Sequence, residues 1–213
     1  MKIIFATANE GKLREAREIL GPGFQVISPA DLGITEDVEE TGSTLEENSA
    51  LKADFIHGQT GMDCFADDTG LEVDALDGAP GVRTARFAAD ALQQASSWPG
   101  AASVKGDHDF DANVDRLLYE LSIRPDKPRT ARFKTCVTLI LGGKHYRFEG
   151  VMEGSIALSR AGCGGFGYDP VFIADAHPEC TTAELGEIGK NEISHRGKAL
   201  RAMAGFLKEN GQK

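Results

Sequence analysis

Apolar runs and helical periodicities alternate along the first third of the chain. Residues 2–7 form a short apolar run typical of a buried strand, and residues 12–20 place apolar side chains, beginning with Leu13 and Ala16, on one face of a helix. The same patterns predict strands at residues 24–28 and 62–66 and a helix from about Ser43 to His57. Strands that alternate with helices predict an α/β fold.

The pattern is less regular in the middle of the chain. Residues 71–76 predict a further strand, Gly78-Ala79-Pro80-Gly81 predicts a turn, and residues 93–106 have the composition of an exposed loop. A helix is predicted at residues 113–121. Two longer strand-like runs, residues 130–141 and 146–157, flank Gly142-Gly143 and predict an antiparallel hairpin.

Composition and charge narrow the class of protein. The chain has 213 residues, of which 41% are hydrophobic, as expected for one large globular domain or two lobes. A net charge of -10 argues against a general nucleic-acid binder, because affinity for a phosphate backbone rests on clustered Lys and Arg. The four cysteines include no C-x-x-C pair, which favours reduced thiols over a zinc site or a disulfide framework. No apolar run approaches the length of a membrane span, so we expect a cytoplasmic protein.

A lysine lies in the first turn of the first predicted helix, where the helix dipole disfavours positive charge. Thr7 and Asn9 supply short polar side chains just before it, and Gly11 permits close approach of the backbone. Unpaired N–H groups at a helix start bind phosphate, and Lys12 would neutralise the same anion. The alternative is a solvated surface lysine, and this stretch alone leaves both interpretations open.

Two adjacent carboxylates, Asp67 and Asp68, follow the apolar run that ends at Ala66. Open α/β sheets place ligands at the carboxyl ends of their strands, and carboxylates there suit Mg²⁺. Because side chains alternate along an extended chain, we expect only one of the two to reach such a site. The alternative is an acidic surface turn. A second acidic cluster, residues 36–42, is typical of a solvated loop. It would contribute carboxylates to a metal site only if the fold brings it beside Asp68.

The stretch GCGGFGYDPVF, residues 162–172, contains the pattern G-x-G-x-x-G. A dinucleotide-binding fingerprint must follow a strand and open a helix, whereas here we expect the chain to continue extended. An aromatic ring such as Phe166 could instead stack on a base while Asp169 and backbone groups meet the edge of that base. The alternative is a structural glycine turn with a core Phe.

Basic residues also gather at the last predicted helix. Ser194 is a candidate N-cap, His195 and Arg196 follow it in the first turn, and Lys190 lies just upstream. Three cations in an acidic protein favour a second anion site. A routine capping or surface histidine is the alternative.

Taken in order, these motifs resemble the inosine triphosphate pyrophosphatases, enzymes that act on deaminated purine nucleoside triphosphates. The matching stretches run from end to end of the chain: residues 7–12, 39–42, 47–48 with Lys52, 66–71, 78–81, 85–87, 164–172 and 193–197.

The resemblance implies a single domain, residues 1–213, with an elongated α/β fold. In that fold a mixed, curved central sheet is flanked by helices, and two lobes surround an active-site cleft. It further implies a homodimer, a requirement for Mg²⁺, and hydrolysis of a nucleoside triphosphate to the monophosphate and pyrophosphate.

Roles follow from the resemblance motif by motif. The implied metal ligands are Glu39 and Asp68, and Asp68 is also the implied proton acceptor. The residues implied to bind substrate are Thr7, Ala8, Asn9, Glu10, Gly11, Lys12, Lys52, Thr69, Phe166, Gly167, Tyr168, Asp169, Lys190, His195 and Arg196.

The chain departs from the family pattern at three places. Ala8 replaces a glycine common in that turn, Thr69 stands where bacterial members usually have Ser, and residues 89–109 are longer than expected, with no assigned role.

Other functions are compatible with parts of the sequence. A Maf-like pyrophosphatase would act on pyrimidine triphosphates, although the Ser194-His195-Arg196 motif and the Phe166 loop argue against it. A non-catalytic nucleotide sensor would bind triphosphate without cleaving it, and a general Mg²⁺ phosphatase would release orthophosphate.

Overall fold

A computed structural model describes residues 1–36, 38–93 and 98–210, and these divide into two compact units. Unit 1 comprises Met1–Thr69, Lys134–Val151 and Ser194–Lys213, and unit 2 comprises Gly70–Phe133 and Met152–Ile193. The described strands form a seven-stranded sheet in the order β2-β1-β3-β5-β6-β7, with β4 beside β3. The sheet is mixed, because β1 pairs parallel with β2 and β3, whereas the β3–β4 and β6–β7 pairs are antiparallel.

Unit 1 holds the N-terminal strands, the longest helices and parts of the three long strands. Its elements are β1 (Lys2–Phe5), α1 (Glu10–Leu20), β2 (Gln25–Ile27), a 3-10 turn (Ala30–Leu32), α2 (Leu45–Thr60), α6 (His195–Asn210) and segments of β3 (Cys64–Val73), β5 (Thr130–Leu141) and β6 (Lys144–Ile156).

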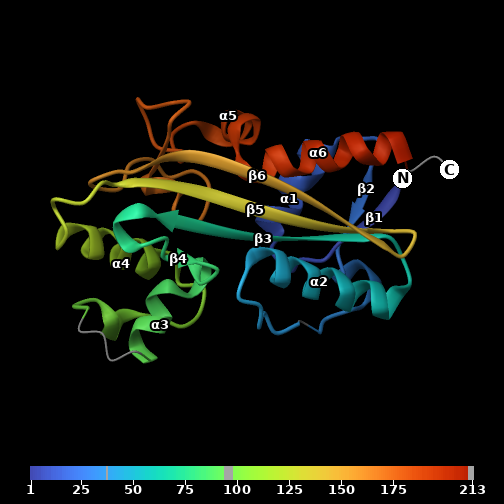
Figure 1. The fold of residues 1–213 in the computed structure, drawn as a ribbon, viewed down its shortest axis with the longest axis horizontal. Coiled ribbons are helices and arrows are strands. Elements are labelled where there is room, and N and C mark those ends of the chain that lie inside the picture. The colour runs from blue at the N-terminus through green and yellow to red at the C-terminus, as the bar shows by residue number, and fades with distance from the viewer. Residues whose placement is uncertain (37, 94–97, 211–213) are drawn as a thin grey trace. The chain divides into compact units, whose positions relative to one another are not determined.

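Helices cover both faces of the sheet in unit 1 (Figure 1). Alternate residues of β1 explain the layers: Ile3 and Phe5 pack in a core with residues of α1 and α6, whereas Ile4 packs in a second core with residues of α2. The apolar stripe predicted for α1 is confirmed, because Leu13, Ala16 and Leu20 are buried in the first of these cores.

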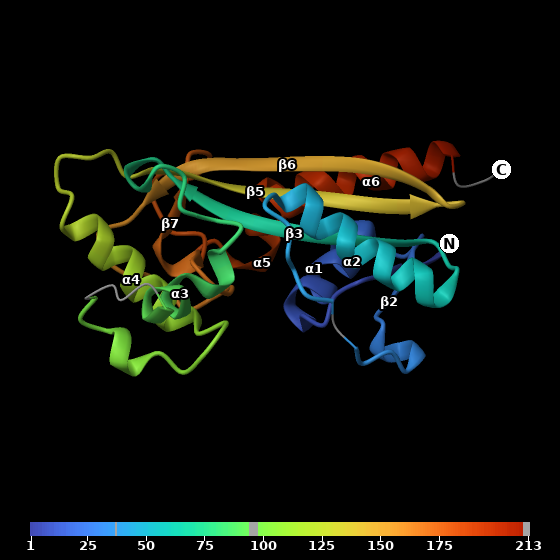
Figure 2. The same cartoon turned by 60° about the horizontal axis from the view of Figure 1, so that its bottom comes forward.

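Unit 2 is built from shorter elements. These are 3-10 turns at Asp74–Leu76, Thr84–Arg86, Ala101–Ser103 and Asp169–Val171, strands β4 (Pro80–Gly81) and β7 (Phe172–Ala174), helices α3 (Phe87–Gln93), α4 (Phe110–Ser122) and α5 (Gly186–Ile193), and the remaining segments of β3, β5 and β6. Within this unit α3 and α4 lie side by side, as two views show (Figures 1 and 2). The core of unit 2 combines α4, including Val114 and Leu117, with Phe133 and Phe172 of the strands.

The prediction that a strand ends at Asp67-Asp68 is wrong. β3 runs unbroken from Cys64 to Val73 and therefore includes residues 71–73 of the separate strand predicted at residues 71–76. The remaining residues of that predicted strand, Asp74–Leu76, form a 3-10 turn. The polar residues do not interrupt the strand because their side chains are buried against partners of opposite charge. The two carboxylates therefore lie in the middle of a strand.

The loop predicted at residues 93–106 is only partly correct. Trp98 is 5% exposed and packs in a small core with Ala88 of α3 and Ala112 of α4. Ser96 and Ser97 lie outside the described residues. The hairpin at residues 130–157 is confirmed, since only Gly142 and Gly143 separate β5 from β6, and both have positive φ. In the described part of the chain, no helix has the length and apolar character needed to cross a membrane.

Candidate active site

The start of α1 is a capped helix terminus. The Asn9 side chain accepts a hydrogen bond from the Lys12 backbone N–H at 3.0 Å, and Thr7 Oγ1 accepts one from Asn9 N at 3.1 Å. A cap of this kind stabilises a helix by about 1 kcal/mol. Ala8, Asn9 and Glu10 are exposed, so this turn is open to a ligand. The local sequence thus produces the predicted helix start.

Asp67 explains why a lysine is tolerated in that first turn. Lys12 Nζ lies 2.9 Å from Asp67 Oδ1, and Arg196 Nε lies 2.8 Å from Asp67 Oδ2. Asp67 is 1% exposed. Burial alone would raise its pKa, but Lys12, Arg196 and Lys52 hold the pKa well below its ordinary value. The carboxylate is therefore ionised and joins α1 to α6 through β3.

Arg196 is placed in the interior of unit 1. Its guanidinium donates to Asp67, to the Glu15 carboxylate and to Thr69 Oγ1, the last at 3.4 Å, and the residue is 1% exposed. Burial opposes its charge, yet the two carboxylates raise the pKa of Arg196 above its ordinary value. Its predicted contact with the nucleotide stays a prediction, and the observed contacts give it a positioning role.

Glu15 is a component that sequence reasoning missed. It is buried beside Leu13 and Ala16 on the apolar side of α1, three residues after Lys12, and Ser194 Oγ donates to it at 3.5 Å. Ser194 also caps α6, as predicted, by accepting a bond from Gly197 N at 2.9 Å. A charged residue within the apolar stripe of a predicted helix was the available signal, because such a charge requires a buried partner.

Asp68 points to the opposite face of β3, which confirms the predicted alternation. Its Oδ1 lies 3.1 Å from Lys52 Nζ, and its Oδ2 accepts a bond from Asn48 Nδ2 at 3.2 Å. Both partners belong to α2. Burial raises the pKa of Asp68 above its ordinary value, although Lys52 and Lys12 oppose the shift. A buried carboxylate of raised pKa is suited to accept a proton.

Part of the acidic cluster at residues 36–42 does meet Asp68, through Lys52. Lys52 Nζ lies 2.8 Å from Glu40 Oε1 as well as 3.1 Å from Asp68 Oδ1, so two carboxylates converge on one positive charge. Burial would lower the pKa of Lys52, but Asp68, Asp67 and Glu40 raise it above its ordinary value. Glu39 is exposed, and its predicted role as a metal ligand stays a prediction. Asp37 lies outside the described residues.

Asn48 also fixes the turn that precedes α2. Its Oδ1 accepts a bond from Gly42 N at 2.8 Å while its amide holds Asp68. Glu47, in contrast, accepts bonds from Ser43 N and Oγ at 2.6 and 2.8 Å, and Thr44 caps the helix. Glu47 therefore holds the residue before the N-cap, whereas Asn48 orients the candidate catalytic carboxylate.

In unit 2 the glycine-rich loop winds around one buried carboxylate. Asp169 accepts bonds from Phe166 N at 2.8 Å, Thr182 Oγ1 at 3.0 Å and Lys190 Nζ at 2.7 Å. Gly165 has a φ of +74°, and a Cβ there would lie 2.0 Å from Asp169 Oδ2. The loop closes on this carboxylate only because the position is glycine. The predicted contact of Asp169 with a base edge stays a prediction.

The aromatic residues of this loop have different environments. Phe166 is half-buried, with Lys190 Nζ 4.5 Å from its ring centroid. Tyr168 lies in the core of unit 2 and donates to Thr84 O at 3.0 Å, and burial strongly raises its pKa. The expectation of extended chain after Gly167 is wrong, because a 3-10 turn, Asp169–Val171, precedes β7. No α-helix opens there among the described residues, so a dinucleotide fingerprint is still excluded.

The basic residues predicted at the last helix are held by separate carboxylates. Lys190 belongs to α5 and pairs with Asp169 within unit 2, whereas Arg196 pairs with Asp67 within unit 1. His195 begins α6 and is buried. A Cβ on Gly150 of β6 would lie 2.0 Å from His195 O, so β6 touches the backbone of this helix start.

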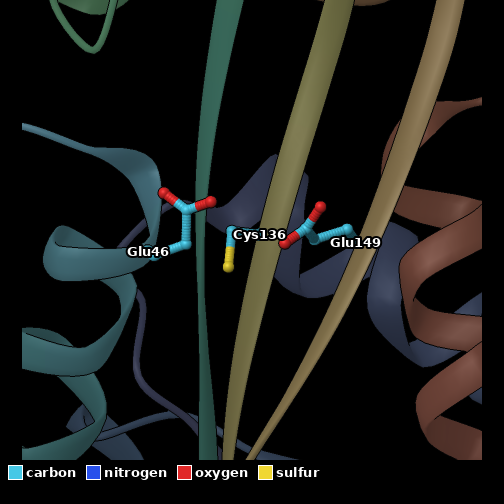
Figure 3. Close-up of side chains that lie close together, drawn as sticks. All are labelled: Glu46, Cys136 and Glu149. Atoms are coloured by element: carbon cyan, nitrogen blue, oxygen red, sulfur yellow. The ribbon is translucent and has the colours of Figure 1, made fainter.

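A separate group of potential metal ligands lies elsewhere in unit 1. Figure 3 shows Cys136 of β5 between Glu46 of α2 and Glu149 of β6, and their ligand atoms lie within 4.8 Å of one another. Burial raises the pKa of Cys136 to about 11, and the sulfur accepts a hydrogen bond from Ser49 Oγ at 3.6 Å. We assign no metal to this group.

The fold and the site define an α/β protein in which one strand carries two oppositely directed carboxylates, each held by basic side chains, near a helix start suited to phosphate. The chain belongs to the Ham1 family, whose model matches residues 3–206.

Comparison with individual proteins agrees with this assignment. The chain is 47% identical over 207 residues to the dITP/XTP pyrophosphatase of Porphyromonas gingivalis, covering 97% of each chain. It is 43% identical over 207 residues to the enzyme of the same name from Christiangramia forsetii, covering 97% of this chain and 99% of the relative. The structure of a HAM1 protein from Coxiella burnetii matches with a TM-score of 0.82 at 34% identity, covering 98% of this chain and 99% of that one. The family resemblance predicted from the motifs is confirmed.

Proposed function

We propose that the protein hydrolyses deaminated purine nucleoside triphosphates, such as ITP, dITP and XTP, to the monophosphate and pyrophosphate. The observation that carries the proposal is the buried Asp68 carboxylate, held by Lys52 and Asn48 in the middle of β3. Membership of the Ham1 family, with dITP/XTP pyrophosphatases among the relatives, supports the substrate class.

In the proposed reaction a water oxygen attacks the α-phosphorus, and the bond from that phosphorus to the bridging oxygen of the β-phosphate breaks. Asp68 orients the water and takes its proton, a role that its raised pKa favours. Lys52, Lys12 and the start of α1 hold the negative phosphate oxygens and the pyrophosphate that leaves. Arg196 acts as a positioning residue. It pairs with Asp67, and Asp67 in turn pairs with Lys12 and holds it in place.

We propose Mg²⁺ as the cofactor. The donor set fits a hard cation, since the carboxylates of Asp68 and Glu40 already converge on a single positive charge, that of Lys52. Asp68 would hold the ion together with Glu39, Glu40 or both. When bound, the ion neutralises charge that develops on the phosphate oxygens.

We propose a role in recognition of the nucleoside for residues that the family resemblance implies. Phe166 and Gly167 would contact the base, and Lys190 and His195 would supply donors suited to the oxygen at C6 of inosine and xanthosine. Asp169 and Tyr168 would shape the loop, because the carboxylate holds the Phe166 backbone and the phenol is part of the core.

A hydrolysis assay tests the proposal. Inosine, xanthosine, guanosine and thymidine triphosphates are each supplied with Mg²⁺, and pyrophosphate is separated from orthophosphate. We expect pyrophosphate from the first two and little from the others. Turnover of thymidine triphosphate would favour a Maf-like pyrimidine enzyme, orthophosphate a general phosphatase, and binding without turnover a sensor.

Three further assignments belong to the proposal. We propose that both units serve one functional domain, residues 1–213, that the protein is a homodimer, and that it acts in the cytoplasm. The cysteines support the last of these, because all four are free thiols.

A further inference from the structure

A pair of hydroxyl groups joins two strands of unit 1 close to the Asp67 carboxylate. Thr69 Oγ1 of β3 lies 2.7 Å from Thr135 Oγ1 of β5. Thr135 is 1% exposed, whereas Thr69 is half-buried. A ligand can therefore reach Thr69 but not Thr135, and any effect of Thr135 on a ligand must act through Thr69.

The surroundings of Thr69 place it among the groups that we propose to hold phosphate. Thr69 Oγ1 lies 3.4 Å from Asp67 Oδ2, and Lys12 Nζ lies 2.9 Å from the other oxygen of the same carboxylate. Lys12 belongs to the helix start that is proposed to bind the phosphate oxygens, and the family resemblance implies Thr69 as a substrate-binding residue. The ligand atom that suits the Thr69 hydroxyl is therefore a phosphate oxygen.

The burial of Thr135 decides which of the two hydroxyls donates. A hydroxyl group has one proton to donate and two lone pairs that accept. Within the described part of the chain, the Thr135 hydroxyl has Thr69 Oγ1 as its only hydrogen-bond partner. If Thr69 donated to Thr135, the buried proton of Thr135 would lack an acceptor, which costs free energy. Thr135 is therefore the donor of this bond.

The second lone pair of Thr69 is also engaged. Arg196 Nη2 donates to Thr69 Oγ1 at 3.4 Å. With Thr135 and Arg196 as its two donors, the Thr69 oxygen accepts no further bond, and its own proton must point to an acceptor. Asp67 Oδ2 takes this proton over a long distance of 3.4 Å, whereas a hydroxyl can approach an anionic oxygen to about 2.5–2.7 Å. The Thr69 proton can therefore form a shorter bond to a phosphate oxygen, which only accepts.

We propose that Thr135 is a positioning residue for triphosphate binding: by donating to Thr69, it holds the Thr69 hydroxyl as a donor toward a phosphate oxygen. The inference rests on the proposed function, which it deepens by adding a buried residue that does not touch the substrate. Both side chains are β-branched, and this restricts rotation about χ1 and keeps the two hydroxyls in register.

Thr135→Val tests the proposal, because valine keeps the branched shape of threonine and lacks the hydroxyl. With Mg²⁺ present, Kd for pyrophosphate and KM for inosine triphosphate should both rise about three- to tenfold, while kcat changes less than about twofold. Thr135→Ser, which keeps the hydroxyl, should restore both constants to within about twofold of wild type. Thr135→Ala takes the place of Thr135→Val in the comparison if the valine variant does not fold.

The same strand offers a matched control. Thr138 of β5 is 5% exposed, and its hydroxyl lies 2.7 Å from Ser49 Oγ of α2, on the opposite face of the sheet. Thr138→Val removes a buried hydroxyl contact of equal length and should leave Kd and KM within about twofold of wild type. Thermal unfolding of both valine variants measures their structural cost. No rise in Kd for Thr135→Val, or an equal rise for Thr138→Val, would overturn the positioning role.

A double-mutant cycle tests whether Thr135 acts through Thr69. Thr69→Val alone should raise Kd for pyrophosphate, and Thr135→Val should add less than about twofold once the Thr69 hydroxyl is gone. Independent losses that multiply in the double variant would overturn the proposal.

Calorimetry of pyrophosphate binding does not depend on turnover, so the two proposals can fail separately. If the wild-type protein hydrolyses inosine triphosphate while Thr135→Val behaves like Thr138→Val, the proposed function survives and the role of Thr135 is lost. If pyrophosphate binding follows the predicted cycle while no triphosphate is hydrolysed, Thr135 keeps its positioning role in a protein that binds phosphate without cleaving it.

Discussion

At the scale of single residues, adjacent positions on one strand have opposite environments. Asp67 faces α1 and α6 and is held ionised by Lys12 and Arg196, whereas Asp68 faces α2 and has a raised pKa. The difference follows from the pleat of β3, which directs neighbouring side chains to opposite faces of the sheet. One carboxylate is suited to hold the structure together and the other to accept a proton.

Substitution of Asp68 tests this division. Asp68→Asn should reduce kcat by a factor of about 10²–10⁴, because the amide cannot accept the proton, while Lys52 stays paired with Glu40 and the fold persists. Steady-state kinetics and thermal unfolding measure the two effects. Asp54→Asn, an exposed carboxylate on α2, is the control and should have normal kinetics. Full activity of Asp68→Asn would remove Asp68 from the mechanism.

Lys12 tests the phosphate assignment. Lys12→Ala should raise KM for the triphosphate by roughly tenfold or more, because a charge-assisted contact of about 1.5–3 kcal/mol is lost. Asp67 stays paired with Arg196, so the free energy of unfolding should fall much less than if both partners were removed. Lys144→Ala, an exposed lysine at the start of β6, is the control. Unaltered kinetics for Lys12→Ala would leave Lys12 as a structural partner of Asp67 only.

At the scale of elements, the start of α6 is fixed from two directions in unit 1. Arg196 reaches Asp67 of β3 and Glu15 of α1, and β6 contacts the helix backbone at Gly150. Ion pairs this deeply buried are costly to break from one side, by about 3–5 kcal/mol, because the remaining charge loses its partner. The helix start is therefore held in position before any ligand binds.

The contact at Gly150 can be tested directly. Gly150→Ala should lower the free energy of unfolding by about 1–3 kcal/mol, because the new Cβ would meet His195 O at 2.0 Å and force β6 away from α6. Chemical denaturation measures the change. Gly205→Ala, in the interior of α6 with open space at its Cβ, should be neutral or stabilising by up to about 1 kcal/mol. Equal stability of the two variants would contradict the close approach of β6 to the backbone of α6 at Gly150.

At the scale of the whole molecule, three of the four cysteines differ clearly in their accessibility to a reagent. Cys64 and Cys136 are buried, and burial raises their pKa values to about 12 and about 11. Cys163 is exposed. A thiol of raised pKa holds less thiolate at any given pH, and only the thiolate reacts with an alkylating reagent.

Alkylation at about pH 8 should therefore modify Cys163 first in the native protein and reach Cys64 and Cys136 only after unfolding. Mass spectrometry of the modified peptides, with and without denaturant, measures the order. Native labelling of Cys136 at the rate of Cys163 would contradict the burial described for unit 1.

Features that depend on neighbouring residues were predictable from the sequence. The helix starts are set by Asn9, Thr44 and Ser194, whose side chains bond to N–H groups three residues away, and the β5–β6 hairpin is set by two glycines. The α/β class followed from the same periodicities, and the family followed from the order of short motifs. Such features are local because a cap or a turn finds its partners within a few residues.

Only the tertiary structure decided which charged side chains pair when they lie far apart in the sequence. Asp67 and Arg196 are 129 positions apart, and Glu15 and Arg196 are 181 apart. No local pattern distinguishes Asp67 from Asp68, or Glu39 from Glu40, because each pair has the same chemistry at neighbouring positions. Their roles depend on which face of a strand or turn meets which helix, and that choice is made by the packing of the whole chain.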